Sequence, residues 1–292
     1  MKNPRFSIII PTYNRANFIE KTIKSVLKQT YTDFELIIVD DGSTDTTEDI
    51  VTSIKDERIN YYKKKNEERA VARNFGIEKA KGDIITFLDS DDLFYENHLE
   101  EASTFLLKDK VAVLFQAYEI VEINSKIKMS FPNKVINQLL IKEGNIISCH
   151  GMFISSSIIK KYKFNEDINL TASEDYELWL RIASNYKIHH NPIITSCLIN
   201  HEGRSVTNIN KEKLIKRKEL FLKYTLSNPA VAEFIGNDKN KFIANAYSYI
   251  ALHLVLAKYK KESLKYYLKT LKKNPFFIFT KRNLAIIKHF AI

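Results

Sequence analysis

Short, uninterrupted apolar runs divide the first ninety residues of the chain. The runs at 6–10, 35–39, 59–62 and 84–88 are bounded by polar or turn-forming residues, a pattern typical of buried β-strands. The segments between them carry apolar residues at helical spacing. Strands that are apolar throughout and alternate with helices favour a parallel sheet covered on both faces. We therefore predict an α/β fold for this part of the chain.

The helical segments have their own start and stop signals. The first helix is expected to be capped by Asn17, and another is predicted over 67–80. Farther along, the pattern is mixed, with a long strand-like stretch at 111–123 and a short one at 151–154. From about residue 211 the chain is predicted to be helical to its end.

The C-terminal part is far more basic than the rest. From Val206 onward sixteen Lys and two Arg face five acids, a net charge of +13, whereas the first 205 residues carry −3. We therefore divide the chain into an α/β domain (1–205) and a basic helical region (206–292). Within the latter, 245–275 is predicted to form two antiparallel amphipathic helices.

Such charge asymmetry is typical of a surface that faces anions, either a membrane or a nucleic acid, although a solvated lysine face explains it equally well. The segment 274–290 mixes aromatic, aliphatic and basic residues, which favours an interfacial helix on anionic lipid over nucleic acid. A helical appendage that packs on the α/β domain, or on a second copy of the chain, is the alternative.

The chain lacks the usual targeting signals. No secretory signal follows Met1, and no apolar run approaches the roughly 20 residues that cross a bilayer. The protein is expected to be cytoplasmic, and either soluble or peripheral on the inner face of the cell membrane. Cys149 and Cys197 form no CxxC pair and are expected to be small buried hydrophobes.

Polar clusters follow three of the predicted strands, at 11–14, 40–43 and 89–92. Because the carboxyl ends of parallel strands meet at one edge of a sheet, these clusters are expected to lie together. The edge has neither GxGxxG nor GxxxxGK[ST], the usual phosphate-binding loops. A bound phosphate would need another positive charge, and the acids of 89–92 suit Mn²⁺ or Mg²⁺. An acidic turn that caps the next helix is the alternative.

Four motifs together resemble the family 2 glycosyltransferases, which have the GT-A fold. They are SIIIPTYNR (7–15), ELIIVDDGSTDTT (35–47), ARNFGIEKAKGDIITFLDSDD (72–92) and SEDYELWLRI (173–182). The resemblance covers about residues 5–205 and implies a mixed, mostly parallel sheet flanked by helices, to which the sequence pattern adds a helical C-terminal extension. It also implies inverting transfer of a sugar from a nucleotide-diphosphate donor, usually a UDP-sugar, to an acceptor hydroxyl.

The resemblance also implies roles for individual residues. Pro11 and Tyr13 would border the nucleobase, Asp41 would accept a hydrogen bond from uracil, and Arg73 would reach the diphosphate. Three further residues would contact the ribose, the sugar and the metal ion: Asp89, Ser90 and, as the main metal ligand, Asp91. An Asx turn, favoured by the following glycine, is the alternative for one of the two acids at 40–41.

The helix at 174–186 carries the predicted catalytic base. Asp175 begins an inward-facing stripe that continues through Leu178, Trp179, Ile182, Ala183 and Tyr186. The resemblance assigns the base to the second acid of the Glu174–Asp175 pair and places Glu174 on the donor side. We expect Asp175 to remove the proton of the acceptor hydroxyl.

The segment LINHEGRSVTN (198–208) resembles the closing loop of the family. His201 would complete the metal site, and Arg204 and Ser205 would hold the diphosphate. A surface turn around Gly203 is the alternative. The other histidines are expected to be structural, with His150 also an acceptor-side candidate.

The QxxRW motif of processive synthases is absent, and the single Trp is Trp179, so we expect one sugar to be added per encounter. The expected acceptor is a bacterial surface glycan or a lipid-linked intermediate. A sugar nucleotidyltransferase is less consistent with the sequence, since no glycine-rich loop follows the first strand. A phospho-receiver module would leave Asp175 and the 89–92 acids unexplained.

Overall fold

The structure is a computed structural model that describes residues 4–122, 125–132, 134–201 and 210–291. The chain forms two compact units. The first comprises 1–136, 147–168 and 186–202, and the second comprises 137–146, 169–185 and 203–292. The division is therefore not a single cut near residue 205. Two short segments from the middle of the chain belong with the C-terminal helices, and one of them contains Asp175.

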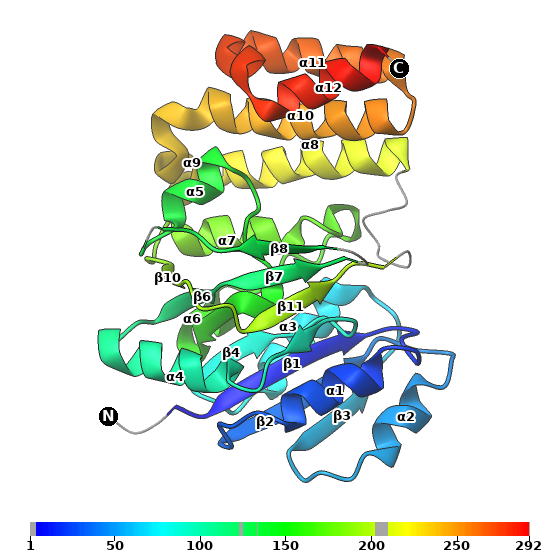
Figure 1. The fold of residues 1–292 in the computed structure, drawn as a ribbon, viewed down its shortest axis with the longest axis vertical. Coiled ribbons are helices and arrows are strands. Elements are labelled where there is room, and N and C mark those ends of the chain that lie inside the picture. The colour runs from blue at the N-terminus through cyan, green and yellow to red at the C-terminus, as the bar shows by residue number, and fades with distance from the viewer. Residues whose placement is uncertain (1–3, 123–124, 133, 202–209, 292) are drawn as a thin grey trace. The chain divides into compact units, whose positions relative to one another are not determined.

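A seven-stranded sheet is the centre of the first unit (Figure 1). Strands β3, β2, β1 and β4 run parallel, β9 is antiparallel to both of its neighbours, and β6 and β10 are parallel to each other. In spatial order the strands are β10 (His189–Asn191), β6 (Val113–Gln116), β9 (Met152–Ser155), β4 (Ile84–Phe87), β1 (Phe6–Thr12), β2 (Phe34–Asp40) and β3 (Ile59–Lys63). This confirms the predicted mixed, mostly parallel sheet.

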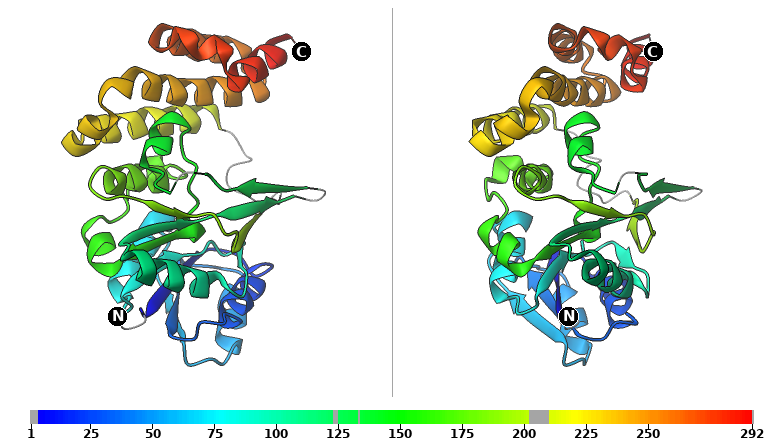
Figure 2. Two further views of the ribbon diagram at one scale, coloured as in Figure 1. Left: turned by 60° about the vertical axis from the view of Figure 1, so that its left-hand side comes forward. Right: turned by 90° about the vertical axis from the view of Figure 1, so that its left-hand side faces the viewer.

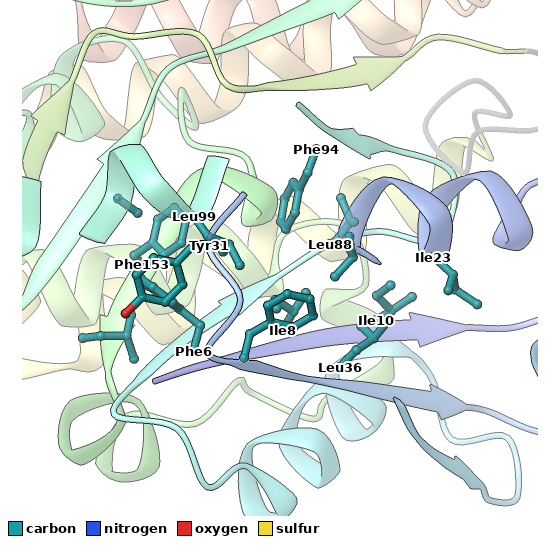
Figure 3. Close-up of a cluster of buried hydrophobic side chains, with 14 of the residues drawn as sticks. Phe6, Ile8, Ile10, Ile23, Tyr31, Leu36, Leu88, Phe94, Leu99 and Phe153 are labelled. Atoms are coloured by element: carbon teal, nitrogen blue, oxygen red, sulfur yellow. The ribbon is translucent and has the colours of Figure 1, made fainter. Parts of the chain in front are cut away.

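Every residue of β1 and of β2 is buried. Both strands lie inside the sheet and are covered on both faces, which explains their continuous apolar sequences. Figure 3 shows Phe6, Ile8 and Ile10 of β1 packed in a cluster with Leu36 and Leu88. The helices of this unit are α1 (Ile19–Leu27), α2 (Thr47–Ser53), α3 (Arg69–Lys79), α4 (His98–Asp109), α6 (Ser156–Lys161) and the 3₁₀ turn η1 (Cys149–Gly151).

Helix α3 packs unusually close to β1. A β-carbon at Gly76 would lie 2.5 Å from Cγ2 of Ile9, so only glycine permits this approach. The start of α1 differs from the prediction. The helix begins at Ile19 with Phe18 at the N-cap and no capping side chain, so the prediction of an Asn17 cap is wrong. Asn17 lies one residue too early, since boundaries depend on tertiary context.

A second, four-stranded sheet also belongs to the first unit. Its order is β5 (Leu93–Phe94), β11 (Ser196–Ile199), β7 (Tyr118–Val121) and β8 (Lys126–Met129). The prediction of one strand over 111–123 is therefore wrong, because β6 and β7 belong to different sheets. The chain turns between them at Ala117, whose N–H donates to Asn191 and whose carbonyl accepts from Thr195. Both cysteines are buried and have free thiols, as expected.

The second unit is helical. Figure 2 shows α8, α10 and α11 running side by side, and α10 packs against both of the others. Its elements are α5 (Asn137–Lys142), α7 (Glu174–Ala183), α8 (Lys211–Ser227), α9 (Pro229–Ile235), η3 (Gly236–Asp238), α10 (Lys239–Leu256), α11 (Lys260–Lys273), η4 (Pro275–Phe279) and α12 (Lys281–Ala291), with η2 (Ile168–Leu170) at the boundary between the units.

Residues Ile250, Leu254, Tyr266 and Ile286 form the core of the second unit with Phe277. Among the described residues, no helix is both long enough and apolar enough to span a bilayer.

Candidate active site

The carboxyl ends of β1, β2 and β4 meet at one edge of the large sheet, as predicted from the polar clusters. In the parallel register Thr12 lies opposite Asp40 and Ile9 lies opposite Phe87. The N–H of Asp41 also donates to the carbonyl of Thr12, at 2.8 Å. The segments 11–14, 40–43 and 89–92 therefore leave the sheet side by side.

The two acids after β2 have different partners. Asp40 accepts hydrogen bonds from the Ser43 N–H at 2.7 Å and from the Tyr61 hydroxyl at 2.7 Å. Burial and this bond to Asp40 raise the pKa of Tyr61. Asp40 therefore stabilises the turn, in which Gly42 has a φ of +84°. This is the Asx role that the sequence left open for one of the two acids.

Asp41 organises the segment that enters α3. Its carboxylate accepts from the N–H groups of Glu67 and Glu68, the latter at 2.8 Å, and from the Lys64 ammonium at 2.9 Å. Burial alone would lower the pKa of Lys64, but its hydrogen bonds to Glu67 and Asp41 raise it. Contact between Asp41 and a nucleobase stays a prediction. Beside it, the Tyr13 ring is 45% exposed, which leaves a face available for stacking.

Arg73 and Asp89 form an ion pair at this edge. Nη2 of Arg73 lies 2.7 Å from Oδ1 of Asp89, and the guanidinium is also over the Phe164 ring, 5.3 Å from its centroid. The Arg73 side chain is only 2% exposed, whereas that of Asp89 is 28% exposed. The structure thus brings together two residues that were predicted to contact the donor, and it buries the cation.

Asp91 faces His201. Its Oδ2 lies 3.1 Å from Nε2 of the imidazole, and Nε of Arg15 lies 3.7 Å from the same oxygen. The His201 ring stacks on Phe18, with 4.5 Å between the ring centroids. Ser90 is buried next to Asp91. Arg15 is a residue that the sequence did not single out, although it ends the motif SIIIPTYNR.

Asp91 and His201 fit a divalent cation. Two ligand atoms in adjacent positions of an octahedral Mg²⁺ site, each about 2.1 Å from the ion, are about 3 Å apart. Oδ2 and Nε2 are hydrogen-bonded at 3.1 Å in this structure, a separation that two adjacent ligands of such an ion also have. Among the described residues, no three His, Cys, Asp or Glu side chains come together to hold a metal ion. An ion at this pair would therefore need further oxygen ligands, which phosphate groups supply.

Asp92 points into the protein and holds β11 in place. Its fully buried carboxylate accepts from the Ile199 N–H at 3.0 Å and lies 3.4 Å from Nδ1 of His150. Its carbonyl accepts from the Thr22 hydroxyl, at 3.0 Å. Since Ile199 lies two residues before His201, Asp92 positions the strand that carries the second candidate ligand. Sequence patterns gave no sign of this role, because the contacts are long-range.

The predicted base lies in the second unit, at the start of α7. Oδ2 of Asp175 accepts from Nδ2 of Asn145 at 3.1 Å, and its side chain is partly exposed. Glu174 is buried, and its carboxylate accepts from the Ser173 N–H at 3.0 Å. The helix ends at Ala183, earlier than predicted. Its apolar positions are buried, but Asp175 stays accessible to a substrate.

Arg204 and Ser205, predicted to hold the diphosphate, lie outside the described residues.

Comparison with known proteins identifies the family. The model of glycosyl transferase family 2 matches residues 7–163. An uncharacterized glycosyltransferase of Haemophilus influenzae is 31% identical over 253 residues, which are 85% of this chain and 97% of that protein. An Escherichia coli protein named UDP-Glc:alpha-D-GlcNAc-diphosphoundecaprenol beta-1,3-glucosyltransferase is 33% identical, covering 76% of this chain and 87% of its own. Some relatives are longer: the match to a Rickettsia felis glycosyltransferase covers 64% of this chain but 32% of that protein.

Solved structures share the fold. The Staphylococcus aureus protein TarS (1–349), in complex with UDP-GlcNAc, superposes with a TM-score of 0.67 at 19% identity, over 92% of this chain and 89% of that one. The mannosyltransferase PcManGT of Pyrobaculum calidifontis, in complex with GDP-Man and Mn²⁺, gives 0.59 at 17% identity, over 100% of this chain and 87% of its own. With the family model covering more than half of the sequence, the chain belongs to glycosyl transferase family 2.

Proposed function

We propose that the protein is a metal-dependent, inverting glycosyltransferase that uses a nucleotide-diphosphate sugar, with UDP as the preferred nucleotide. The acceptor is a hydroxyl of a surface glycan or of a lipid-linked glycan intermediate. The observation that carries the proposal is the pairing of Asp91 with His201 at the strand edge, beside the Arg73–Asp89 ion pair. This observation supports the proposal because two potential metal ligands and a buried guanidinium lie at the sheet edge where α/β proteins commonly bind their ligands.

The nucleoside half of the donor fits the ends of β1 and β2. The exposed side chain of Tyr13 offers a face for stacking, and Asp41 offers a carboxylate to the base edge. Pro11 is buried at the end of β1, so its proposed role is to support the turn that carries Tyr13. The Asp41 oxygens already accept several hydrogen bonds from 64–68. A base that reaches Asp41 would thus contact a carboxylate whose orientation is fixed before binding.

The diphosphate half fits the end of β4. Asp91 and His201 would hold a divalent cation, which neutralises the charge that develops on the leaving diphosphate. Asp89 and Ser90 directly precede Asp91 in the chain and are proposed to contact the ribose and the transferred sugar. Arg73, held by Asp89, adds a positive charge that does not have to be ordered when the donor binds. Arg204 and Ser205 are proposed to close over the same phosphates.

Inversion requires a single displacement at the anomeric carbon. The acceptor oxygen forms the new bond to this carbon as the bond to the diphosphate oxygen breaks, and the hydroxyl proton moves to a base. We assign the base to Asp175, because Glu174 is buried and its carboxylate accepts from the Ser173 N–H. Glu174, the predicted donor-side residue, is proposed to support the start of α7. A positioned base of this kind contributes about 10²–10⁴-fold to the rate.

The relatives support the proposal. The name of the E. coli relative states a UDP-sugar donor and a lipid-linked diphosphate acceptor. The two structural neighbours are complexes with nucleotide sugars, one of which also contains Mn²⁺.

The same proposal includes contact with a membrane through the C-terminal segment. Phe276 and Phe279 are 75% and 80% exposed, and Leu284 is 66% exposed. Lys272, Lys273 and Lys281 flank them in sequence. Exposed aromatic and aliphatic side chains among lysines suit the interface of an anionic bilayer.

We expect the substitution of Phe276 and Phe279 by Ser to reduce flotation with phosphatidylglycerol vesicles. Flotation that does not change would contradict the membrane contact. If the wild type is then a dimer in sedimentation equilibrium and the substitutions dissociate it, this surface contacts a second copy of the chain.

A donor screen tests the proposed activity. Purified protein is incubated with Mn²⁺ and each of a panel of UDP- and GDP-sugars, and release of the nucleoside diphosphate is measured. We expect slow release from one UDP-sugar, abolished by EDTA and restored by Mn²⁺. Thermal shift with UDP is the second measurement, since a ligand that binds only the folded state raises the melting temperature. A shift that requires both UDP and Mn²⁺ supports the proposal, and no shift with any nucleotide contradicts it.

A further inference from the structure

The second unit contains three cations in one place. Arg217 and Lys218 come from α8, and Arg282 comes from α12. The Lys218 ammonium lies 3.2 Å from the hydroxyl of Ser173, two residues before Asp175. We call Arg217, Lys218 and Arg282 the basic cluster.

Helix α10 supplies the polar and aromatic surroundings of the basic cluster. Nη1 of Arg282 donates to the Ser248 hydroxyl at 2.9 Å. The Lys218 ammonium lies over the Tyr249 ring, 4.4 Å from its centroid. The hydroxyl gives Arg282 a hydrogen-bond acceptor, and the ring gives Lys218 a cation–π contact. Neither group carries a negative charge, so the two cations are not neutralised by these contacts.

The basic cluster has no direct counter-ion. Within the described ranges, no carboxylate oxygen lies within 4.0 Å of a side-chain nitrogen of Arg217, Lys218 or Arg282. Nε of Arg217 is buried and has no hydrogen-bond partner in the same part of the chain. Buried charges in proteins are ordinarily paired with an opposite charge. Three neighbouring cations without a counter-ion therefore suggest that an anion binds there.

The electrostatics agree with this geometry. Burial, followed by the neighbouring Arg217, lowers the pKa of Lys218 to about 7, although Asp175 acts in the opposite direction. Burial and the three cations also lower the pKa of His253 to about 4. The lowered pKa of Lys218 means that its charged form is destabilised in this place, and an anion bound beside it would offset that destabilisation.

A lysine-rich solvated face does not explain these residues. Lys216 and Lys223 lie on the same helix and are exposed, as such a face requires. Arg217, Lys218 and Arg282 are instead partly buried, and each donates to a backbone carbonyl or a hydroxyl. The basic cluster is therefore distinct from the general positive charge of the C-terminal region.

We propose that the basic cluster binds phosphate groups of the acceptor, as in a sugar linked to a lipid through a diphosphate. The inference rests on the proposed function, because it takes Asp175 to be the base that contacts the acceptor hydroxyl. Asp175 belongs to the same unit and is electrostatically coupled to Lys218. Guanidinium groups suit this ligand, since their planar N–H pairs match phosphate oxygens. The acceptor would thus be held by its phosphates with its hydroxyl beside the base.

Binding of geranyl diphosphate tests the proposal. This soluble prenyl diphosphate contains the phosphates and a short lipid but no sugar. Titration calorimetry is done at pH 6, about one unit below the pKa of Lys218, in saturating UDP and Mn²⁺ so that the donor site is filled. We expect Lys218→Gln and Arg282→Gln to weaken binding at least tenfold. Lys216→Gln, on an exposed position of the same helix, is the matched control and is expected to bind as the wild type does.

The variants are expected to fold, because Lys218→Gln removes an uncompensated charge. Equal melting temperatures of Lys218→Gln and Lys216→Gln check this point. If both variants bind geranyl diphosphate with the wild-type affinity, the proposal is wrong. A protein that fails to bind UDP contradicts the proposed function itself, whereas one that binds UDP normally and geranyl diphosphate independently of Lys218 contradicts only the present inference.

Two further probes distinguish the source of the phosphate. Inorganic phosphate is expected to compete weakly with geranyl diphosphate in the wild type and not in Lys218→Gln. Vesicles of phosphatidylglycerol are expected to bind Lys218→Gln and wild type equally, since the proposed ligand is the acceptor and not the bilayer. Loss of vesicle binding in Lys218→Gln without loss of geranyl diphosphate binding would overturn the proposal in favour of a membrane contact.

Discussion

Nε2 of His201 lies 3.1 Å from Oδ2 of Asp91, although 110 positions separate the two residues in the chain. Asp91 follows β4 of the large sheet, and His201 follows β11 of the small sheet. The pair is therefore formed only when both sheets of the first unit are in place.

Replacement of Asp91 tests the metal site. In Asp91→Asn the amide oxygen is a weaker ligand than a carboxylate, so the thermal stabilisation by UDP with Mn²⁺ is expected to disappear. Glu96→Gln, an exposed acid close by in sequence, is the control and is expected to keep the full shift. An undiminished shift in Asp91→Asn would show that the ion binds elsewhere.

Replacement of Asp175 tests the base. Asp175→Asn preserves the size of the side chain but removes the proton acceptor, so we expect kcat to fall by about 10²–10⁴-fold. The KM for the donor is expected to stay within a factor of about two, because no contact with the donor is proposed for Asp175 itself. Glu233→Gln, an exposed change in the second unit, controls for nonspecific effects. Wild-type turnover in Asp175→Asn would rule out the assignment.

Replacement of Asp92 tests a structural role. Asp92→Ala removes the acceptor of the partly buried hydrogen bond from the Ile199 N–H and the carboxylate next to the buried His150. Losing such a buried partner costs about 1–3 kcal/mol, so the urea midpoint should fall accordingly. Glu96→Ala is expected to change the midpoint little. Equal midpoints for the two variants would mean that Asp92 contributes no net stability.

The free energy of unfolding should depend on pH through Lys218. Its pKa is about 7 in the folded protein, against 10.5 for an ordinary lysine. Between these values the unfolded chain binds more protons than the folded one, so stability rises with pH. Lys218→Met removes this contribution. Its stability relative to wild type is therefore expected to be greatest below pH 7 and to decline toward pH 10.

The matched control for this dependence is Lys216→Met, whose stability difference from wild type should be flat over the same range. Two titratable neighbours of Lys218 limit the pH range of the measurement. Burial and nearby cations, Lys218 among them, lower the pKa of His253 to about 4, and burial raises the pKa of Tyr249 above its ordinary value, so the profiles are compared between pH 7 and pH 10. Parallel pH profiles for wild type and Lys218→Met would mean that the lysine is well solvated.

The close packing of α3 on β1 gives a further prediction. Gly76→Ala places a β-carbon 2.5 Å from Cγ2 of Ile9 and should destabilise the protein by about 1–3 kcal/mol. In an Ile9→Ala background the additional cost of Gly76→Ala should be smaller, because the clashing atoms are gone. A double-mutant cycle on urea midpoints measures this difference. Additive effects would place the strain at another contact.

The strands of the large sheet could be predicted from the sequence because burial on both faces leaves a continuous apolar run, as in β1 and β2. The break between β6 and β7 could not be predicted from the sequence. The hydrophobic pattern of an apolar run is the same whether the run stays in one sheet or passes to a second sheet at Ala117. The short strands β5, β10 and β11 contain too few residues for a period to show. The prediction of an Asn17 cap failed because the N-cap preference of a single residue is weaker than tertiary packing in setting where a helix begins.

The candidate site shows the same division. Asp91, Asp89 and Arg73 are found from motifs, because each follows or faces the end of an apolar strand. Arg15 comes close to Asp91 only through the fold. The basic cluster is formed by α8 and α12, is contacted by α10 and has no sequence motif. The net charge of the C-terminal region showed an excess of lysine but could not show which cations lie close together.

The corner at Ala117 has a consequence for how such a protein diversifies. Residues 113–121 are held in two sheets at once, with β6 inside the large sheet and β7 next to the hairpin strand β8. Insertions between β7 and β8 therefore lengthen a peripheral hairpin without shifting the register of the large sheet. The length of this hairpin can therefore change while the edge formed by the carboxyl ends of β1, β2 and β4 stays as it is.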